Sequence, residues 1–345
     1  MHAALIVPAP FDAVTGGYEY DRRIVAGLSE AGHDVRVVEL AGTHPVADAT
    51  AREAARVAWH SMTAEWRPII DGLALPAFAG LDDALAVRGA VGLIHHPTSM
   101  ESGLSEAGRA SLLAAEKRLL PWLARIVVTS EPTSDSLVAD FGVSRDRIRV
   151  VVPGTDDAPR SAGSGGPTCR ILSIGTLVPR KGHDLLLRAL ARLFDLDWHL
   201  TIVGSPERDP VHAQALAQLA EELGLAKRVR FAGVVTGGAL EALWEETDVF
   251  ALATSWEGYG MAIAEALKRG VPVAVTDGGA AGHLVTPEAG VVCPARDQTN
   301  LSKALRRVIF GKDLRRSMAE AAWQIGQTLP GWHAQVREFI QALAD

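Results

Sequence analysis

The chain has 345 residues, of which 48% are apolar, enough for one very large domain or two domains of ordinary size. A net charge of −7 excludes the positive field with which proteins attract nucleic acid or an anionic membrane, so we expect small-molecule partners and no nucleic acid. The two cysteines, Cys169 and Cys293, are too few for a disulfide framework or a cysteine zinc site, which predicts a cytoplasmic location.

Short apolar segments recur through the first half of the chain, and each is followed by a stretch with helical spacing. The predicted strands cover residues 3–7, 35–40, 91–94, 126–129 and 148–152. Segments that are apolar throughout are typical of parallel strands covered by helices on both faces. Residues 1–155 are therefore predicted to form a Rossmann-like α/β domain with a doubly wound sheet.

A stretch rich in Gly, Ser and Pro, residues 156–168, follows this domain and is predicted to be a linker. The strand pattern then resumes at residues 170–174, 200–203, 229–231, 249–253, 273–275 and 291–293. A second α/β domain is therefore predicted over residues 169–325. The cleft between two such domains is where a ligand is first expected. No segment approaches the ~20 apolar residues that span a bilayer, so at most peripheral membrane contact is expected.

The most informative segment joins the strand at residues 249–253 to a predicted helix. The turn and the helix start comprise Gly258, Tyr259, Gly260 and Met261. Backbone N–H groups at a helix start, reached through small residues, can bind a diphosphate. Glu257 precedes the turn, and Glu265 lies about one turn inside the helix, where it can accept hydrogen bonds from ribose hydroxyls. The alternative is that both glutamates only favour the helix dipole.

A second cluster, the pair Arg180 and Lys181, lies between a strand and a helix predicted to begin near residue 184. Two adjacent cations there could neutralise a diphosphate and the charge that grows on it as a glycosidic bond breaks. The alternative is a solvated basic turn with no ligand.

Two further motifs follow strands of the first domain. Gly16 and Gly17 are predicted to form a turn between the first strand and the first helix, where ligands meet open α/β sheets. His95 and His96 directly follow the strand at residues 91–94, and an imidazole there could bond a sugar hydroxyl or stabilise developing positive charge. A tight turn and structural histidines are the alternatives. No Cys, Asp or Glu lies at the usual ligand spacing from these histidines, so no metal site is predicted.

The paired-glutamate segment EGYGMAIAEALKRGVPV resembles the E-x7-E motif of the family 4 retaining glycosyltransferases. In that family the first glutamate, here Glu257, contacts hydroxyls of the donor sugar, and the second, here Glu265, binds the ribose. The turn amides hold the diphosphate. The resemblance therefore implies a donor-binding site.

Other motifs carry the same resemblance. Lys181 fits the family's G-R-x4-K-G stretch, whose cations clamp the donor phosphates, but Thr176 stands where the arginine is usual. Either Arg180 substitutes for that arginine or phosphate binding is weaker. The Gly16–Gly17 element resembles the family's Gly-Gly loop, and His95 aligns best with its active-site histidine. By the same resemblance, Gly204 and Val234 lie near the donor.

The resemblance implies a GT-B fold, in which two Rossmann-like domains face a central cleft. The first domain would bind the acceptor and the second the nucleotide sugar, with the C-terminal segment, residues 326–345, forming a helix that packs back on the first domain. The implied catalytic residues are His95, Lys181 and Glu257. The implied reaction is sugar transfer with retention, without metal or cofactor, from a nucleotide-diphosphate sugar.

The donor expected by family frequency is a UDP-sugar, and the expected acceptor is small and soluble. Two alternatives stay open. A related GT-B enzyme could transfer to a non-sugar nucleophile, and a non-catalytic protein could only sense a nucleotide sugar.

Overall fold

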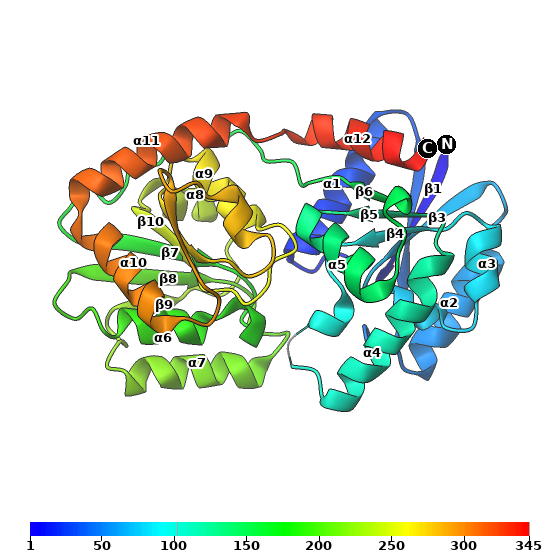
Figure 1. Ribbon diagram of the computed structural model, residues 1–345, viewed down its shortest axis with the longest axis horizontal. Helices are drawn as coiled ribbons and strands as arrows, with labels where there is room; N and C mark the ends of the chain where they lie inside the picture. The colour runs from blue at the N-terminus through cyan, green and yellow to red at the C-terminus, as the bar shows by residue number, and fades with distance from the viewer. Residues whose placement is uncertain (102, 345) are drawn as a thin grey trace. The chain divides into compact units, whose positions relative to one another are not determined.

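The computed structural model describes residues 1–101 and 103–344, and it divides into two compact units (Figure 1). The first unit contains residues 1–154 and the C-terminal residues from Trp332 onward, and the second contains residues 155–331. Residues 156–168, expected as a linker, form no helix or strand and group with the second unit, as does Thr155, which was expected in the first domain. Residues 326–331 group there too, although they were expected with the C-terminal helix, while Asp345 lies outside the described residues.

The first unit is built on a parallel six-stranded sheet with the strand order β2-β1-β3-β4-β5-β6. Its strands are β1 His2–Pro8, β2 Asp34–Leu40, β3 Trp66–Asp71, β4 Val91–Ile94, β5 Arg125–Val128 and β6 Ile148–Val150. Its α-helices are α1 Gly16–Glu30, α2 Ala49–Ser61, α3 Asp82–Val87, α4 Glu106–Leu119, α5 Glu131–Phe141 and α12 Trp332–Ala344. The 3-10 turns are η1 Leu75–Phe78, η2 Thr98–Met100, η3 Leu120–Trp122 and η4 Arg145–Arg147.

Strand β3 was not predicted from the sequence, although it lies between β1 and β4 in the sheet. Pro68 argues against a strand because proline has no N–H to donate. In the structure Pro68 pairs with Ala4 of β1, and pairing with β4 begins only at Ile69. Pro68 thus lies where one side of the strand is still open, and the sheet tolerates it.

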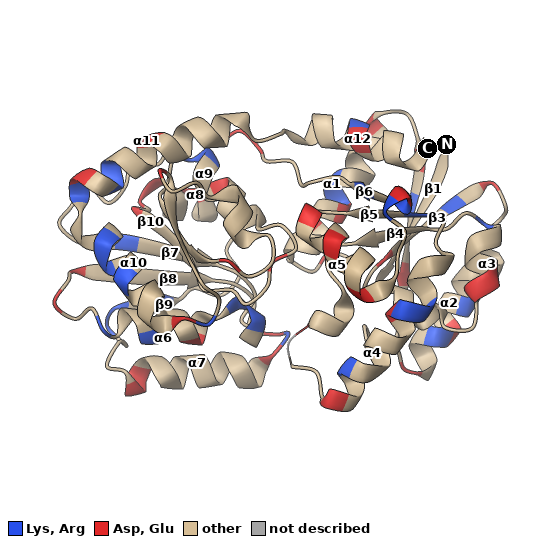
Figure 2. Ribbon diagram, viewed as in Figure 1, with Lys and Arg blue, Asp and Glu red and all other residues tan. Residues whose placement is uncertain are grey.

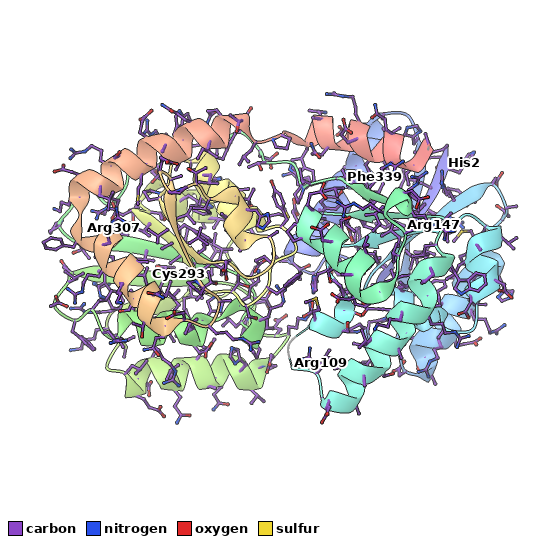
Figure 3. All side chains as sticks on the ribbon, viewed as in Figure 1. His2, Arg109, Arg147, Cys293, Arg307 and Phe339 are labelled. Carbon is purple, nitrogen blue, oxygen red and sulfur yellow. The ribbon has the colours of Figure 1, made fainter. Side chains whose placement is uncertain are left out.

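Helix α12 packs on α1 within the first unit. The two helices approach closely at Gly27 of α1, where an added Cβ would lie 2.3 Å from a methyl carbon of Val336. Phe339, labelled in Figure 3, is fully buried. Arg67 of β3 donates a hydrogen bond to the carbonyl of Leu343. Packing and a hydrogen bond therefore tie the C-terminal helix to this unit.

The second unit has a parallel six-stranded sheet with the order β12-β11-β10-β7-β8-β9. Its strands are β7 Cys169–Ile174, β8 Trp198–Val203, β9 Val229–Phe231, β10 Val249–Leu252, β11 Val273–Thr276 and β12 Gly290–Cys293. Its helices are α6 His183–Leu190, α7 Pro210–Glu222, α8 Gly237–Glu245, α9 Met261–Lys268, α10 Gln298–Phe310 and α11 Lys312–Thr328, with 3-10 turns η5 Pro179–Lys181 and η6 Ala281–Leu284. All six predicted strands of this half are confirmed.

Charged side chains of both signs are interspersed over the helices of each unit (Figure 2). This distribution agrees with the small net charge of the sequence. A large single-sign field, of the kind that attracts a polyanion, needs charges gathered on one face. The dispersed pattern agrees with the expectation of small-molecule partners.

One glycine fixes how η5 leads into α6. Gly182 has a left-handed backbone with φ of 66°, and a Cβ there would lie only 1.9 Å from the carbonyl oxygen of Ala253. That oxygen belongs to the backbone just past β10, so it cannot rotate away as a side chain would. The carboxyl ends of β7 and β10 can approach each other because residue 182 is glycine.

We expect Gly182→Ala to lower the free energy of unfolding by more than about 2 kcal/mol, because a left-handed alanine costs about 1 kcal/mol and the clash adds to it. Gly224→Ala is the matched control in the same unit, with φ of 71° and an added Cβ that would lie 3.7 Å from the Phe194 ring, an ordinary contact distance. Urea denaturation of both variants measures the difference. Equal losses would show that the close approach to Ala253 is not constraining.

Candidate functional site

A buried ion pair lies at the carboxyl edge of the second sheet. Lys181 Nζ lies 2.7 Å from Glu257 Oε1, and the two side chains are 16% and 9% exposed. Lys181 ends η5, which follows β7, and Glu257 lies between β10 and α9. Two segments far apart in the sequence are therefore joined by one short contact between opposite charges.

Arg180 supplies a second cation to the same carboxylate. Its Nη1 lies 3.7 Å from Glu257 Oε1 and donates a 2.6 Å hydrogen bond to the carbonyl of Trp256. Burial alone raises the pKa of Glu257, but the charges of Lys181 and Arg180 lower it by more, so that its pKa is below the usual value. Glu257 is therefore ionised at neutral pH, between two positive groups.

The backbone around this pair is fixed by hydrogen bonds. The carbonyl of Arg180 accepts the N–H of Ser255 at 2.8 Å and the hydroxyl of Thr254 at 3.1 Å. Glu257 donates its own N–H to Gly278 at 3.0 Å, and its carbonyl accepts the N–H of Ala280. The pair is thus held by main-chain contacts on both sides and does not depend on side-chain packing alone.

The helix that follows begins as the sequence predicted. Gly260 precedes α9 with φ of 102°, and as the N-cap residue it has no side chain with which to cap the first N–H groups of that helix. Met261 is its first residue, and Glu265 is half-buried about one turn later. Tyr259, in the turn, is buried, and burial raises its pKa to about 12, so its hydroxyl stays protonated. Gly258 is partly exposed in the same turn.

The ends of β7 and β8 meet beside Lys181. A Cβ on Gly175 would lie 3.0 Å from Cδ of Lys181, and one on Gly204 would lie 2.0 Å from the carbonyl oxygen of Gly175. Thr176 is half-buried in this turn, and Val234 is 48% exposed after β9. Because both glycines lack side chains, the lysine stem and the two strand ends pack closely.

One residue beside this site was missed by the sequence analysis. His183 is completely buried at the start of α6, and neither ring nitrogen has a hydrogen-bond partner among the described residues. Burial, with the nearby charge of Lys181, lowers its pKa to about 3. The imidazole is therefore neutral and adds no third positive charge beside Glu257. The sequence shows that His183 directly follows Lys181 and Gly182, but it does not show that the imidazole is buried.

We expect Lys181→Met to destabilise the protein by about 3 kcal/mol, because the methionine leaves the Glu257 carboxylate buried without its closest cation. Lys227→Met is the control, since Lys227 is exposed and no ion pair to it is present among the described residues. Urea denaturation at pH 7 compares the two variants. A loss no larger than that of the control would contradict the ion pair.

A second polar cluster lies in the first unit. His95 Nε2 lies 3.0 Å from Asp21 Oδ1 and 3.8 Å from Asp71 Oδ2. Asp21 comes from α1, Asp71 ends β3, and His95 follows β4. Local spacing had argued against a metal here, but the fold brings two distant carboxylates to the histidine, and the ligand atoms of all three lie within 4.8 Å of one another. The spacing argument therefore does not hold for this position.

The Gly16–Gly17 element differs from its expected form. It was predicted as a turn before the first helix, but Gly16 is the first residue of α1. The hydroxyl of Thr15 caps the helix by accepting the N–H of Tyr18, which draws the glycines into its first turn. A Cβ on Gly17 would lie 3.2 Å from the His95 ring. Glycine at this position thus allows the helix start to approach the histidine closely.

His96, the second choice for the functional histidine, has a different environment. Its Nε2 lies 2.7 Å from Glu101 Oε1. The carboxylate of Glu116 on α4 accepts hydrogen bonds from the N–H groups of Thr98 and Ser99. Arg109, labelled in Figure 3, donates to the carbonyl of Ser99 at 2.9 Å. Helix α4 thus anchors the segment after His96, and a structural role fits this histidine.

Several solved structures share this fold. Sucrose-phosphate synthase from Thermosynechococcus elongatus has a TM-score of 0.82 at 20% identity, over 99% of this chain and 98% of that one. The HepE protein of Anabaena, solved with UDP and glucose, has a TM-score of 0.76 at 16% identity, over 99% of this chain and 100% of that one. The fold is that of the GT-B glycosyltransferases, as the sequence predicted.

The family follows from the sequence. The model for glycosyl transferases group 1 matches residues 156–324, and that for glycosyltransferase family 4 matches residues 71–158. This chain belongs to the group 1, family 4 glycosyltransferases.

Among curated relatives, the D-inositol 3-phosphate glycosyltransferase of Thermomonospora curvata is 29% identical over 241 residues, 63% of this chain and 56% of that protein. Mannosylfructose-phosphate synthase of Agrobacterium fabrum is 31% identical over 171 residues, 44% of this chain and 37% of that protein. The chain spans about half the length of the curated relatives it matches. Among the described residues, none of the helices is long and apolar enough to cross a membrane.

Proposed function

We propose that this chain is a retaining glycosyltransferase that moves a sugar from a nucleotide-diphosphate sugar to an acceptor. In this proposal the second unit binds the donor and the first binds the acceptor. The observation that carries it is the buried pair of Lys181 and Glu257, with Arg180 beside it, next to the uncapped start of α9. A diphosphate is the ligand that two adjacent cations and the first N–H groups of a helix fit best.

Each part of a donor has a candidate partner in this arrangement. The diphosphate would contact Lys181, Arg180 and the first N–H groups of α9 at Met261. Glu265 would accept hydrogen bonds from the ribose. Glu257, ionised and fixed, would orient hydroxyls of the sugar, because a carboxylate only accepts hydrogen bonds. The turn residues Gly258 to Gly260 and the nearby Thr176, Gly204 and Val234 complete the proposed donor site.

The proposed reaction needs stabilisation of a leaving group. The acceptor oxygen forms a bond to the anomeric carbon on the face from which the diphosphate departs, and the acceptor proton passes to the departing phosphate oxygen. Negative charge then grows on the diphosphate. Lys181 and Arg180 stabilise it without a metal or other cofactor, because their charges are fixed before the bond breaks. His95 would contact the substrate from the first unit.

The donor base and the acceptor are the finer parts of the proposal. UDP is the favoured base, and the HepE neighbour was solved with UDP-glucose. Several relatives carry the name D-inositol 3-phosphate glycosyltransferase, so that phosphorylated polyol is the first acceptor to test. A small soluble acceptor is proposed. A cytoplasmic location is proposed as well, because Cys169 and Cys293 are both free thiols.

One observation supports a second candidate function. Thr176 breaks the family's phosphate motif, which would suit a protein that binds a nucleotide sugar without reacting it. Such a sensor would never release free nucleotide from UDP-glucose with any acceptor. A transferase to a non-sugar nucleophile would release nucleotide and give a product without a new sugar-to-sugar bond. Product analysis separates the three outcomes.

We expect one of UDP, GDP and ADP to raise the melting temperature of the purified protein, because a ligand that binds only the folded state stabilises it. The shift should persist in EDTA and be lost in Glu265→Ala. Glu222→Ala is the control, because Glu222 is an exposed helical glutamate of the same unit. If no diphosphate changes the melting temperature, the donor-site assignment is wrong. A shift abolished by EDTA would contradict the metal-free site.

A further inference from the structure

Asp21 and Asp71, which lie against His95 in the first unit, have no role in the proposed donor chemistry. The side chains of Asp21 and Asp71 are 0% and 1% exposed, whereas that of His95 is 19% exposed. A substrate can therefore reach the imidazole edge but neither carboxylate. Any influence of the two aspartates on a substrate must act through His95.

The hydrogen bond sets the state of the ring. A carboxylate oxygen accepts hydrogen bonds, so the 3.0 Å contact with Asp21 Oδ1 is satisfied when Nε2 of His95 carries a proton. The other ring nitrogen, Nδ1, has no hydrogen-bond partner in residues 1–101 and 103–344. When Nδ1 carries a proton, it can therefore donate a hydrogen bond to a ligand.

The ring is also held in place from several sides. Gly17 lies against one edge, where no Cβ intervenes, and the ring of Tyr20 makes an edge contact with a centroid distance of 5.3 Å. The carbonyl of His95 accepts weak hydrogen bonds from the hydroxyls of Thr129 at 3.3 Å and Thr133 at 3.4 Å. These contacts occupy the carbonyl and leave the ring as the group that can contact a substrate.

A cation could also lie between three such side chains. The direct hydrogen bond between Nε2 and Asp21 argues against it, because a cation at that point would replace the proton and separate the two atoms. Asp71 Oδ1 already accepts the N–H of Leu73 at 2.8 Å. A proton on Nε2 therefore accounts for the contact between His95 and Asp21 Oδ1, while Asp21 Oδ2 is buried without a hydrogen-bond partner among the described residues.

We propose that Asp21 and Asp71 are positioning residues that hold His95 as a fixed, positively charged hydrogen-bond donor, whose exposed edge contacts an oxygen atom of the substrate. The substrate part of this inference rests on the proposed function. The state of His95 does not, because it follows from contacts within the first unit alone.

The charges around the ring agree with this assignment. Burial alone lowers the pKa of His95, but Asp21 and then Asp71 raise it, and the result is a pKa above the usual value. Burial and the charge of Asp21 raise the pKa of Asp71 to about 7. Tyr20 stays neutral because burial raises its pKa well above the usual range, and its hydroxyl donates to the carbonyl of Val151. His96 faces Glu101 instead of this cluster.

The test is an NMR titration of the intact protein with ¹⁵N-labelled histidine, in which His95→Gln identifies the His95 signals. We expect His95 to titrate above the ordinary histidine value and to keep its proton on Nε2. Asp21→Asn should lower its pKa by about one unit or more, a tenfold change in the protonation constant, because the isosteric amide keeps an acceptor but loses the charge. Asp71→Asn should lower it by less.

Glu101→Gln is the matched control. It neutralises the carboxylate beside His96, and the pKa of His95 should not change. A general loss of structure would alter both histidines, whereas the proposed effect is confined to one. If Asp21→Asn does not fold, Asp71→Asn provides the same comparison. His95 titrating at or below the ordinary value, with no response to either variant, would overturn the inference.

Two further outcomes are decisive. A stoichiometric divalent ion in the purified protein, or a change in the His95 signals on adding EDTA, would show that the cluster binds metal and that the proposal is wrong. With UDP-glucose as the donor probe, Asp21→Asn should move the alkaline limb of the kcat profile to lower pH. If no sugar transfer is detected but His95 titrates above the ordinary histidine value as expected, the proposed function is rejected and the assignment of His95 stands.

Discussion

The contact between Lys181 and Glu257 is the interaction on which the second unit's site depends. A carboxylate as buried as Glu257 is costly unless cations compensate it, and Lys181 at 2.7 Å with Arg180 at 3.7 Å supplies that compensation. The same two cations are the groups that the proposed reaction uses on the diphosphate. Glu257 therefore keeps the two cations in place before a donor arrives. The cations in turn keep the Glu257 carboxylate ionised.

The backbone geometry makes this contact possible. Gly182, Gly175 and Gly204 each lie where a Cβ would meet a neighbouring backbone or the lysine stem. The ends of β7, β8 and β10 can therefore converge, as expected at the carboxyl edge of an open parallel sheet. The buried His183 next to Lys181 is neutral and adds no positive charge at this edge.

How much the sequence could predict differs between the two units. In the second unit the informative residues lie in two short segments, one at Arg180 and Lys181 and one from Glu257 to Glu265, so that the turn and the helix start at Met261 were predictable from local pattern. In the first unit they come from three separate elements. Asp71 was missed because β3 was missed, since Pro68 leaves only two apolar residues, Ile69 and Ile70, before it. Asp21 was missed because a carboxylate on a surface helix is normally exposed, whereas this one is completely buried.

The central claim is that Lys181 stabilises charge that develops during the reaction, beyond holding the nucleotide. The most direct measurement compares Lys181→Ala with the wild-type protein, using kcat for UDP release from UDP-glucose and the Kd of UDP by calorimetry. An interaction made chiefly in the transition state lowers kcat more than it weakens ground-state binding. We expect the fall in kcat to exceed the rise in Kd by at least about tenfold. Equal changes in both quantities would contradict it.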